Sequence, residues 1–168
     1  MILSKLNSQY FNKRENIDNS VRRIHMQKVL RFCQKAIVEK NGKILIMKTS
    51  EVDPSPFMWE VPGGGINWGE DLKDGFNREL KEEVGPDFEV ECGDPVYISS
   101  WIHPYHRVLA HAVWVFLPCK YKKGTVKLSE EHCEYAWINP QDYKNYPMLD
   151  MVKNAIQKYI KLKKEKGI

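Results

Sequence analysis

The sequence predicts an α+β domain in which a mixed β-sheet lies between helices. Three observations support this prediction. Two β-rich runs flank an Asn-Gly turn near residue 41, an acidic amphipathic helix follows a glycine cluster, and a second amphipathic helix lies near the end of the chain. With 168 residues and 42% hydrophobic content, the chain is long enough for a single domain with its own core.

The first 27 residues are polar with scattered apolar side chains and show no sustained period. They are compatible with a short helix, an arm in a dimer or a partly disordered leader. We therefore expect the folded domain to span residues 28–168. The formal charge of +4 is mild, and the basic residues gather at the two ends of the chain. Nucleic acid is accordingly not the expected partner.

A β-hairpin is expected first. Residues 29–38 read VLRFCQKAIV, Asn41-Gly42 is a strong turn signal, and residues 43–48 return as KILIMK. The stretch 49–56 contains two X-Pro pairs and is expected to be a loop. Residues 58–61 then lead into Pro62 and three glycines.

Several short strands are expected after the acidic helix, at residues 88–92, 96–103, 108–121 and 135–138. Asn139-Pro140 opens a turn. The apolar positions between Met148 and Leu162 recur at helical spacing, which predicts a closing amphipathic helix with a lysine-rich last turn.

The acidic helix is the most informative element of the sequence. Asp71 is its expected N-cap, Gly85 and Pro86 end it, and its apolar stripe consists of Leu72, Phe76, Leu80 and Val84. At about 100° per residue, Glu79, Glu82 and Glu83 fall on one flank beside this stripe.

This arrangement of carboxylates is costly unless a cation binds them. Glu79 and Glu83, like Glu79 and Glu82, are like-charge neighbours that cost a few tenths of a kcal/mol per pair, and Gly75 on the same flank costs about 1 kcal/mol against alanine. Hard carboxylate oxygens favour Mg²⁺, with Mn²⁺ as an alternative. The sequence therefore predicts a divalent metal site on this helix.

The stretch from Gly64 to Pro86 resembles the Nudix box. Gly64, five residues, Glu70, seven residues and then the run RELKEEVG at 78–85 match the family pattern, and Pro86 departs from it at the last position. The resemblance implies a Nudix-like α/β/α sandwich. It also implies hydrolysis of a phosphoanhydride bond in a nucleoside diphosphate linked to another moiety, such as a nucleoside triphosphate, ADP-ribose or a dinucleoside polyphosphate.

The resemblance also implies roles for individual residues. Arg78 would orient Glu79, while Glu79, Glu82 and Glu83 would bind metal, together with a backbone carbonyl around Gly63. The catalytic set expected on this basis is Arg78, Glu79, Glu83 and Glu134. Glu79 is the candidate general base. Glu134 is favoured as the additional acid beyond the helix, with Glu131 kept open.

The substrate contacts are expected from residues in or beside loops. Trp68, Tyr105, His106 and Arg107 are the candidates, because an exposed aromatic ring stacks on a nucleobase and a cation meets phosphate. The alternative to hydrolysis is a Nudix-like module that binds or senses a nucleotide without turnover. The intact carboxylate set argues against this alternative.

The four cysteines, Cys33, Cys92, Cys119 and Cys133, form no CxxC pair and are expected to be reduced thiols in or near the core. No stretch of the sequence has the length of a transmembrane helix, so no membrane is expected and the cytoplasm is the expected location. A homodimer is a further expectation from the family resemblance.

Overall fold

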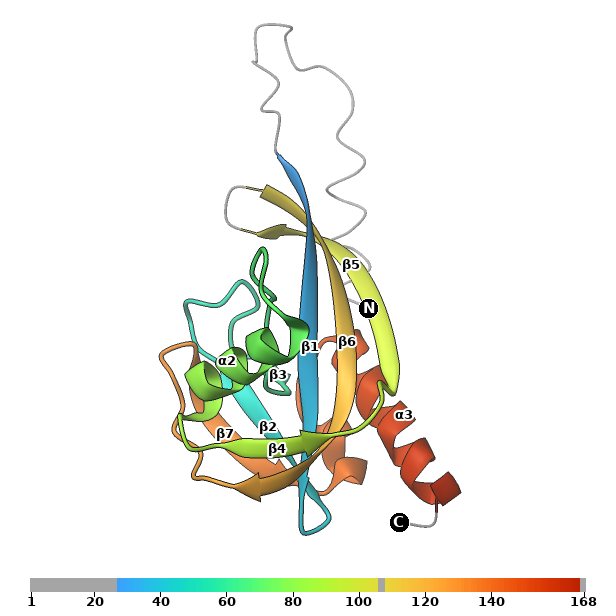
Figure 1. Cartoon of the computed structure of the whole chain (residues 1–168). Coiled ribbons are helices and arrows are strands. Elements are labelled where there is room, and N and C mark those ends of the chain that lie inside the picture. The colour runs from blue at the N-terminus through green and yellow to red at the C-terminus, as the bar shows by residue number, and fades with distance from the viewer. Residues whose placement is uncertain (1–26, 106–107, 167–168) are drawn as a thin grey trace, which may run out of the picture.

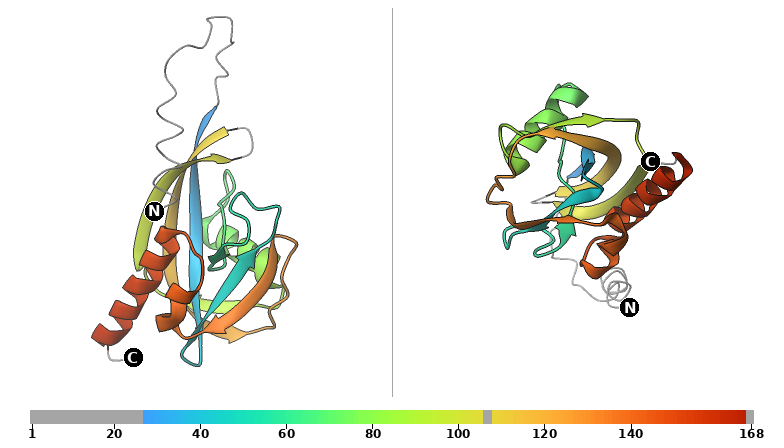
Figure 2. Two further views of the ribbon diagram at one scale, coloured as in Figure 1. Left: turned by 180° about the vertical axis from the view of Figure 1, so that it is seen from behind. Right: turned by 90° about the horizontal axis from the view of Figure 1, so that it is seen from below.

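The computed structural model describes residues 27–105 and 108–166. It confirms the α/β/α sandwich: α2 (Leu72–Val84) lies on one face of the β-sheet and α3 (Asp150–Lys166) on the other (Figures 1 and 2). The strands are β1 (Lys28–Lys40), β2 (Lys43–Thr49), β3 (Trp59–Glu60), β4 (Glu89–Cys92), β5 (Tyr97–Tyr105), β6 (Val108–Lys123) and β7 (His132–Ile138). The expected leader, apart from residue 27, lies outside the described residues.

The sheet is mixed, as expected. Its main order is β3-β2-β1-β6-β4, with β5 also paired to β6 and β7 also paired to β2. β1 and β6 run parallel over twelve aligned positions from Lys28 opposite Leu109 to Glu39 opposite Lys120, whereas the other strand pairs are antiparallel. A short 3-10 helix, η1 (Pro140–Asn145), forms where the Asn-Pro turn is expected.

β1 and β2 separate soon after their turn. They are aligned only at Glu39 with Ile44 and at Lys40 with Lys43. Further along, the free edge of β1 binds the glycine segment instead: Gln34 N–H donates to the Gly64 carbonyl (3.0 Å), and Ala36 N–H donates to the Pro62 carbonyl (2.7 Å). The glycine segment is thereby fixed to the sheet along its backbone.

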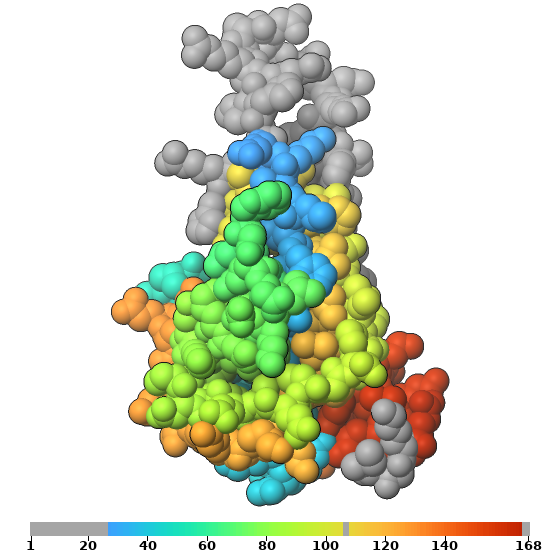
Figure 3. Space-filling model, viewed as in Figure 1, coloured from blue at the N-terminus to red at the C-terminus, as the bar shows by residue number. Residues whose placement is uncertain are grey.

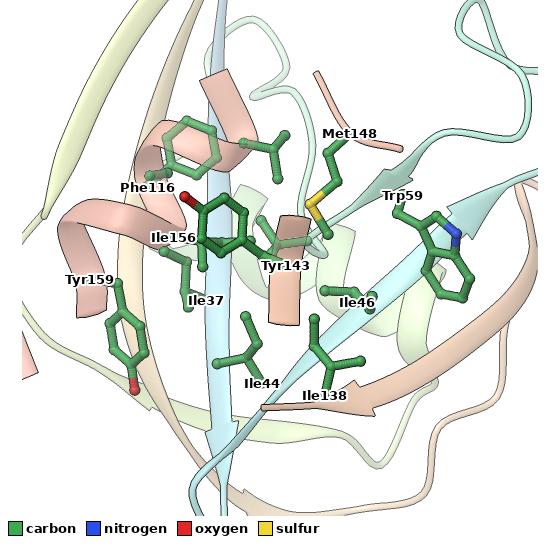
Figure 4. Packing of buried hydrophobic residues seen from close by; sticks show 13 residues of the cluster. Ile37, Ile44, Ile46, Trp59, Phe116, Ile138, Tyr143, Met148, Ile156 and Tyr159 are labelled. Atoms are coloured by element: carbon green, nitrogen blue, oxygen red, sulfur yellow. The ribbon is translucent and has the colours of Figure 1, made fainter. Parts of the chain in front are cut away.

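Two hydrophobic clusters hold the helices to the sheet. Under α3, Ile156 and Tyr159 pack with the inward-facing Ile37 of β1 and Ile44 of β2, as Figure 4 shows. Under α2, the predicted apolar residues Phe76, Leu80 and Val84 pack against the alternate positions of the same strands: Ala36, Val38, Leu45 and Met47. Side chains alternate between the two faces along β1 and β2, so both strands contribute residues to the cluster under α2 and to the cluster under α3.

The cysteine expectation is wrong for one pair. Cys92 and Cys119 form a disulfide, while Cys33 and Cys133 are free. The antiparallel register of β4 and β6 places Cys92 directly opposite Cys119, with their Cα atoms 3.9 Å apart. This pairing of residues 27 positions apart is a product of tertiary strand pairing, which cysteine spacing alone does not reveal.

The described residues include no helix that is both long enough and apolar enough to span a membrane.

Candidate active site

Helix α2 begins and ends as its sequence dictates. The Asp71 carboxylate caps the first turn by accepting a hydrogen bond from Lys73 N–H, and Gly85 ends the helix with φ of 124°. Burial of Phe76, Leu80 and Val84 turns the flank with Glu79, Glu82 and Glu83 toward the glycine segment, whereas Leu72 of the predicted stripe is exposed. In Figure 3, α2 and this segment lie against β1.

Arg78 holds the acidic flank together. Its Nε and Nη2 donate to the two carboxylate oxygens of Glu70 at 2.8 and 2.9 Å, and Nη2 also donates to the Gly65 carbonyl at 2.9 Å. Its Nη1 donates to Glu79 at 2.8 Å and to Glu82 at 3.0 Å. The hydrogen bonds from Arg78, with one from the Asn67 backbone, lower the pKa of Glu70 to about 2. The Arg78 guanidinium thus fixes the carboxylates of Glu70, Glu79 and Glu82 and binds the glycine segment at Gly65.

Glu83 is the buried member of the set, with 5% of its surface exposed. Its Oε2 accepts a hydrogen bond of 2.6 Å from Gly63 N–H. Burial raises the pKa of Glu83 to about 7, although the positive charge of Lys35 opposes the shift. Such a carboxylate is poised to ionise when a cation approaches.

The glycines make room for these carboxylates. A β-carbon at Gly64 would occupy the space of the Glu79 carboxylate, and one at Gly63 would collide with the Gln34 carbonyl of β1. Gly63 also has φ of 116°, which side chains rarely tolerate. Gly63 therefore requires glycine, whereas a side chain at Gly64 would displace the Glu79 carboxylate.

A second, buried network adjoins Glu83. Lys35 Nζ of β1 lies 2.9 Å from Glu60 Oε2 of β3, and His132 Nε2 of β7 lies 3.1 Å from Glu60 Oε1. Burial works against ionisation of Glu60, but the Lys35 charge and the His132 hydrogen bond lower the pKa of Glu60 to about 2. Burial of Lys35 disfavours its charged form, but the nearby Glu60 charge outweighs this effect and raises the pKa of Lys35. One ligand atom each of Glu60, Glu83 and His132 lies within 4.8 Å of the others.

Lys35, Glu60 and Glu83 border a cavity of about 610 Å³. This volume is typical of a small-molecule site. Its acidic side is lined by Glu79, Glu82 and Glu83 together with Gly63, Gly64 and Gly65. Its other side comes from β1, β5 and β6 and carries Arg31, Lys35, Trp101, His103, Tyr105 and Trp114.

The residues fit a divalent cation. Glu79, Glu82 and Glu83 each keep one carboxylate oxygen that has no hydrogen-bond partner among the described residues, because Arg78 or Gly63 binds only the other oxygen. The Gly63 carbonyl likewise has no hydrogen-bond partner within residues 27–105 and 108–166. These are hard oxygen donors around one cavity, the donor type that Mg²⁺ and Mn²⁺ prefer.

The other predicted residues are dispersed. Tyr105 lines the cavity, but Trp68 is fully exposed and is not part of the lining. Glu131 lines the cavity with Glu130, whereas Glu134 lies outside the lining with its Oε2 3.4 Å from Lys48 Nζ. The last two substrate candidates, His106 and Arg107, lie outside the described residues.

Lys35, Glu60 and His132 are not among the residues that the sequence analysis assigns to the site. A charged residue inside an apolar strand pattern is the signal that could have revealed Lys35 and Glu60. Lys35 lies on the same face of β1 as the buried Cys33 and Ile37, and Glu60 directly follows the buried Trp59. Charged residues are almost never fully buried without a partner, so each of these two residues predicts a buried partner of opposite charge.

A layered mixed sheet whose glycine loop and acidic helix enclose a carboxylate cavity defines a hydrolase of phosphoanhydrides. The family model described as NUDIX domain matches residues 35–161, which is most of the chain. The chain therefore belongs to the Nudix family and is a Nudix-type pyrophosphohydrolase.

Individual relatives agree with this assignment. The nucleoside triphosphatase NudI of Escherichia coli (strain K12) is 25% identical over 118 residues, which cover 67% of this chain and 84% of NudI. The MutT NUDIX hydrolase from Burkholderia pseudomallei has the same fold, with a TM-score of 0.66 and 21% identity over 77% of this chain and 98% of that one. An ADP-ribose pyrophosphatase from Streptococcus suis 89-1591 has a TM-score of 0.54 and 22% identity over 76% of this chain and 85% of its own.

Proposed function

We propose that the protein is a Mg²⁺-dependent hydrolase that cleaves a phosphoanhydride bond in a nucleoside diphosphate linked to another moiety, with a nucleoside triphosphate as the favoured substrate. The observation that carries this proposal is that Glu79, Glu82 and Glu83 all line one cavity. The similarity to a nucleoside triphosphatase supports the choice of substrate. ADP-ribose and dinucleoside polyphosphates are the other members of the class, and Mn²⁺ is the other cation that suits the donors.

Glu79, Glu82, Glu83 and the Gly63 carbonyl would hold the cation. When bound, a divalent ion neutralises phosphate oxygens and makes a water molecule more acidic. Arg78 keeps Glu79 and Glu82 oriented, and Gly63 N–H anchors Glu83. Both contacts fix carboxylates before substrate arrives, which lowers the cost of ordering them during the reaction.

Glu79 is our candidate for the group that takes the proton from the attacking water. It lines the cavity and is fixed through one oxygen only. For the additional acid beyond the helix, which the sequence analysis assigns to Glu134, placement favours Glu131, because Glu131 lines the cavity and Glu134 does not. A cytoplasmic location and a homodimer stay predictions.

The test is release of nucleotide or phosphate with Mg²⁺ from nucleoside triphosphates, ADP-ribose, dinucleoside polyphosphates and capped RNA. Glu79→Gln is expected to lower kcat by about 10²-fold or more, since loss of a positioned general base has that effect. Glu89→Gln is the matched control, because Glu89 is an exposed residue of β4 whose carboxylate pairs with Lys123 and lies outside the cavity lining. No turnover of any substrate, or full turnover by Glu79→Gln, contradicts the proposal.

The same assay compares Glu131→Gln with Glu134→Gln. We expect the larger loss of kcat for Glu131→Gln. A larger loss for Glu134→Gln would instead support the assignment made from the sequence.

A further inference from the structure

The Glu60 carboxylate joins three strands inside the protein. Its Oε2 lies 2.9 Å from Lys35 Nζ of β1, and its Oε1 lies 3.1 Å from His132 Nε2 of β7. The three side chains are at most 15% exposed. Both β3 and β7 pair with β2, and neither pairs with β1 in the described sheet. The Glu60 side chain therefore supplies a link between β1 and β7 that strand pairing does not.

One end of this link is the backbone that anchors Glu83. Glu60 lies three positions before Gly63, whose N–H donates to Glu83 Oε2 at 2.6 Å. Between them, the Pro62 carbonyl accepts a hydrogen bond of 2.7 Å from β1. The ion pair with Lys35 is a second attachment of this short segment to β1. A shift of the segment would carry Gly63 N–H away from Glu83.

The other end of the link is the turn that carries Glu131. His132 N–H donates to the Ser129 carbonyl at 3.2 Å, and Ser50 N–H donates to the Glu131 carbonyl at 2.8 Å. Ser129 and Glu131 both line the cavity. His132 Nδ1 has no hydrogen-bond partner among residues 27–105 and 108–166, so the contact of Nε2 with Glu60 is the hydrogen bond that orients the ring. The position of the turn therefore depends on Glu60 as well.

The surroundings of Glu60 suit a support better than a cation ligand. Lys35 occupies one of its carboxylate oxygens and His132 the other, whereas one oxygen of Glu83 has no hydrogen-bond partner in the described part of the chain. Lys35 also brings a positive charge to Glu60, and like charges repel. Ligand atoms of Glu60 and Glu83 nevertheless lie within 4.8 Å of each other. Glu60 thus stands directly beside a candidate metal ligand.

A buried ion pair is a costly way to stabilise a fold. Ions lose their hydration on burial, and well-packed apolar side chains of similar volume are often as stabilising or more so. The pair of Lys35 and Glu60 borders the cavity with the carboxylates of α2. This location points to a task in the site.

We propose that Glu60 is a positioning residue for the cation site. Through Lys35, it fixes the segment that anchors Glu83. Through His132, it fixes the turn that carries Glu131. The inference rests on the proposed hydrolase function and adds the support that keeps these two acids in place. Residues that orient metal ligands from behind typically change metal affinity or activity by about 10–100-fold when they are substituted.

The main test is a double substitution that removes the link without leaving a buried charge. Lys35→Met/Glu60→Leu replaces the ion pair by apolar side chains, an exchange that is often neutral or stabilising. We expect its affinity for Mn²⁺, measured by electron paramagnetic resonance without substrate, and its kcat each to fall about tenfold or more. Urea unfolding of the same variant shows whether the fold is kept. If Glu60 only stabilised the fold, a stable double variant would bind Mn²⁺ normally.

Substitutions at His132 test the link from β7. His132→Leu removes the hydrogen bond to Glu60, so Mn²⁺ affinity and kcat should fall. His132→Gln offers a side-chain N–H near the place of Nε2 and should recover most of the loss. Lys122→Met/Glu91→Leu is the matched control, because this exposed pair joins β6 to β4 at 2.8 Å and lies outside the cavity lining. We expect the control to leave both quantities unchanged.

Three results overturn the inference. The first is a stable Lys35→Met/Glu60→Leu variant that binds Mn²⁺ as tightly as the unsubstituted protein. The second is an equal loss for His132→Leu and His132→Gln. The third is the absence of Mn²⁺ binding by the unsubstituted protein.

Failure of this inference and failure of the proposed function are distinguishable. If the double variant binds Mn²⁺ more weakly while the unsubstituted protein hydrolyses no substrate, the positioning role of Glu60 stands and the proposed hydrolysis fails. If Glu79→Gln lowers kcat while the double variant keeps both its Mn²⁺ affinity and its kcat, the hydrolysis stands and the role of Glu60 fails.

Discussion

Replacement of Lys35 by methionine removes a buried lysine charge from the network around Glu60. Methionine keeps most of the side-chain length but not the charge. The Lys35 and Glu60 side chains are 6% and 15% exposed, and their charged atoms lie 2.9 Å apart. Without Lys35, His132 is the side chain still hydrogen-bonded to Glu60 among the described residues.

The expected loss is large for a single substitution. Removing one partner of a buried ion pair typically costs about 3–5 kcal/mol, because the other charge stays buried without compensation. A domain of this kind has a free energy of unfolding of about 5–15 kcal/mol. Lys35→Met is therefore expected to lose a third or more of the stability of a domain near the middle of that range.

The assay is urea unfolding at pH 7 in EDTA, so that metal binding does not contribute to the measured stability. Lys48→Met is a matched control: Lys48 lies on β2 and pairs with Glu134 at 3.4 Å, but the two side chains are 30% and 57% exposed. An exposed pair of this type contributes less than about 1 kcal/mol. The double variant Lys35→Met/Glu60→Leu should be more stable than Lys35→Met alone.

Two results would refute this reasoning. One is a loss for Lys35→Met no larger than that for Lys48→Met. The other is a double variant that is less stable than Lys35→Met, because it would mean that Glu60 stabilises the fold without its cation.

Three further predictions concern other parts of the molecule. Gly64→Ala should displace the Glu79 carboxylate and lower kcat while the melting temperature stays nearly unchanged; equal kcat would refute the contact. Thiol titration of the unfolded, non-reduced protein should find two free thiols, because Cys92 is bonded to Cys119, and four would contradict the disulfide. Burial opposes ionisation of Glu39, but hydrogen bonds from Lys163 and Tyr159 of α3 lower its pKa below its ordinary value of 4.5. Its contribution to stability is therefore present above pH 4.5 and lost as the pH falls through the lowered pKa, so unfolding of Glu39→Gln should depend less on pH in that acidic range.

The sequence predicted those features that depend on neighbours along the chain. The α2 helix, its Asp71 cap and its carboxylate flank follow from a 3.6-residue period and a capping side chain, and the β1–β2 hairpin follows from Asn41-Gly42. These signals are local, so a single sequence contains them.

The features that the sequence did not predict join residues that are distant along the chain. Lys35 meets Glu60 across 25 positions, and Glu60 meets His132 across 72. Glu60 meets His132 because β3 and β7 both pair with β2. Lys35 meets Glu60 because the segment that follows β3 is hydrogen-bonded to β1 at Ala36. The row of Arg31, Ala112 and Trp101 across β1, β6 and β5 has the same origin, because it depends on the register of three strands. Alternation places Trp101 on a face but does not say which residue stands beside it.

The separation of β1 from β2 explains why the glycine segment and the aromatic residues of β5 border one cavity. Where β2 no longer pairs with β1, the edge of β1 binds the glycine segment through Gln34 and Ala36. The segment is thereby fixed to the sheet by backbone hydrogen bonds, as a strand would be. Such a fixed scaffold suits carboxylates that must keep their geometry. The opposite edge of β1 is aligned with β6 and, through it, with the outer strand β5. Substitutions on β5 are therefore expected to change the aromatic side of the cavity at Trp101 without moving Glu79 or Glu83, because β5 is aligned with β1 through β6.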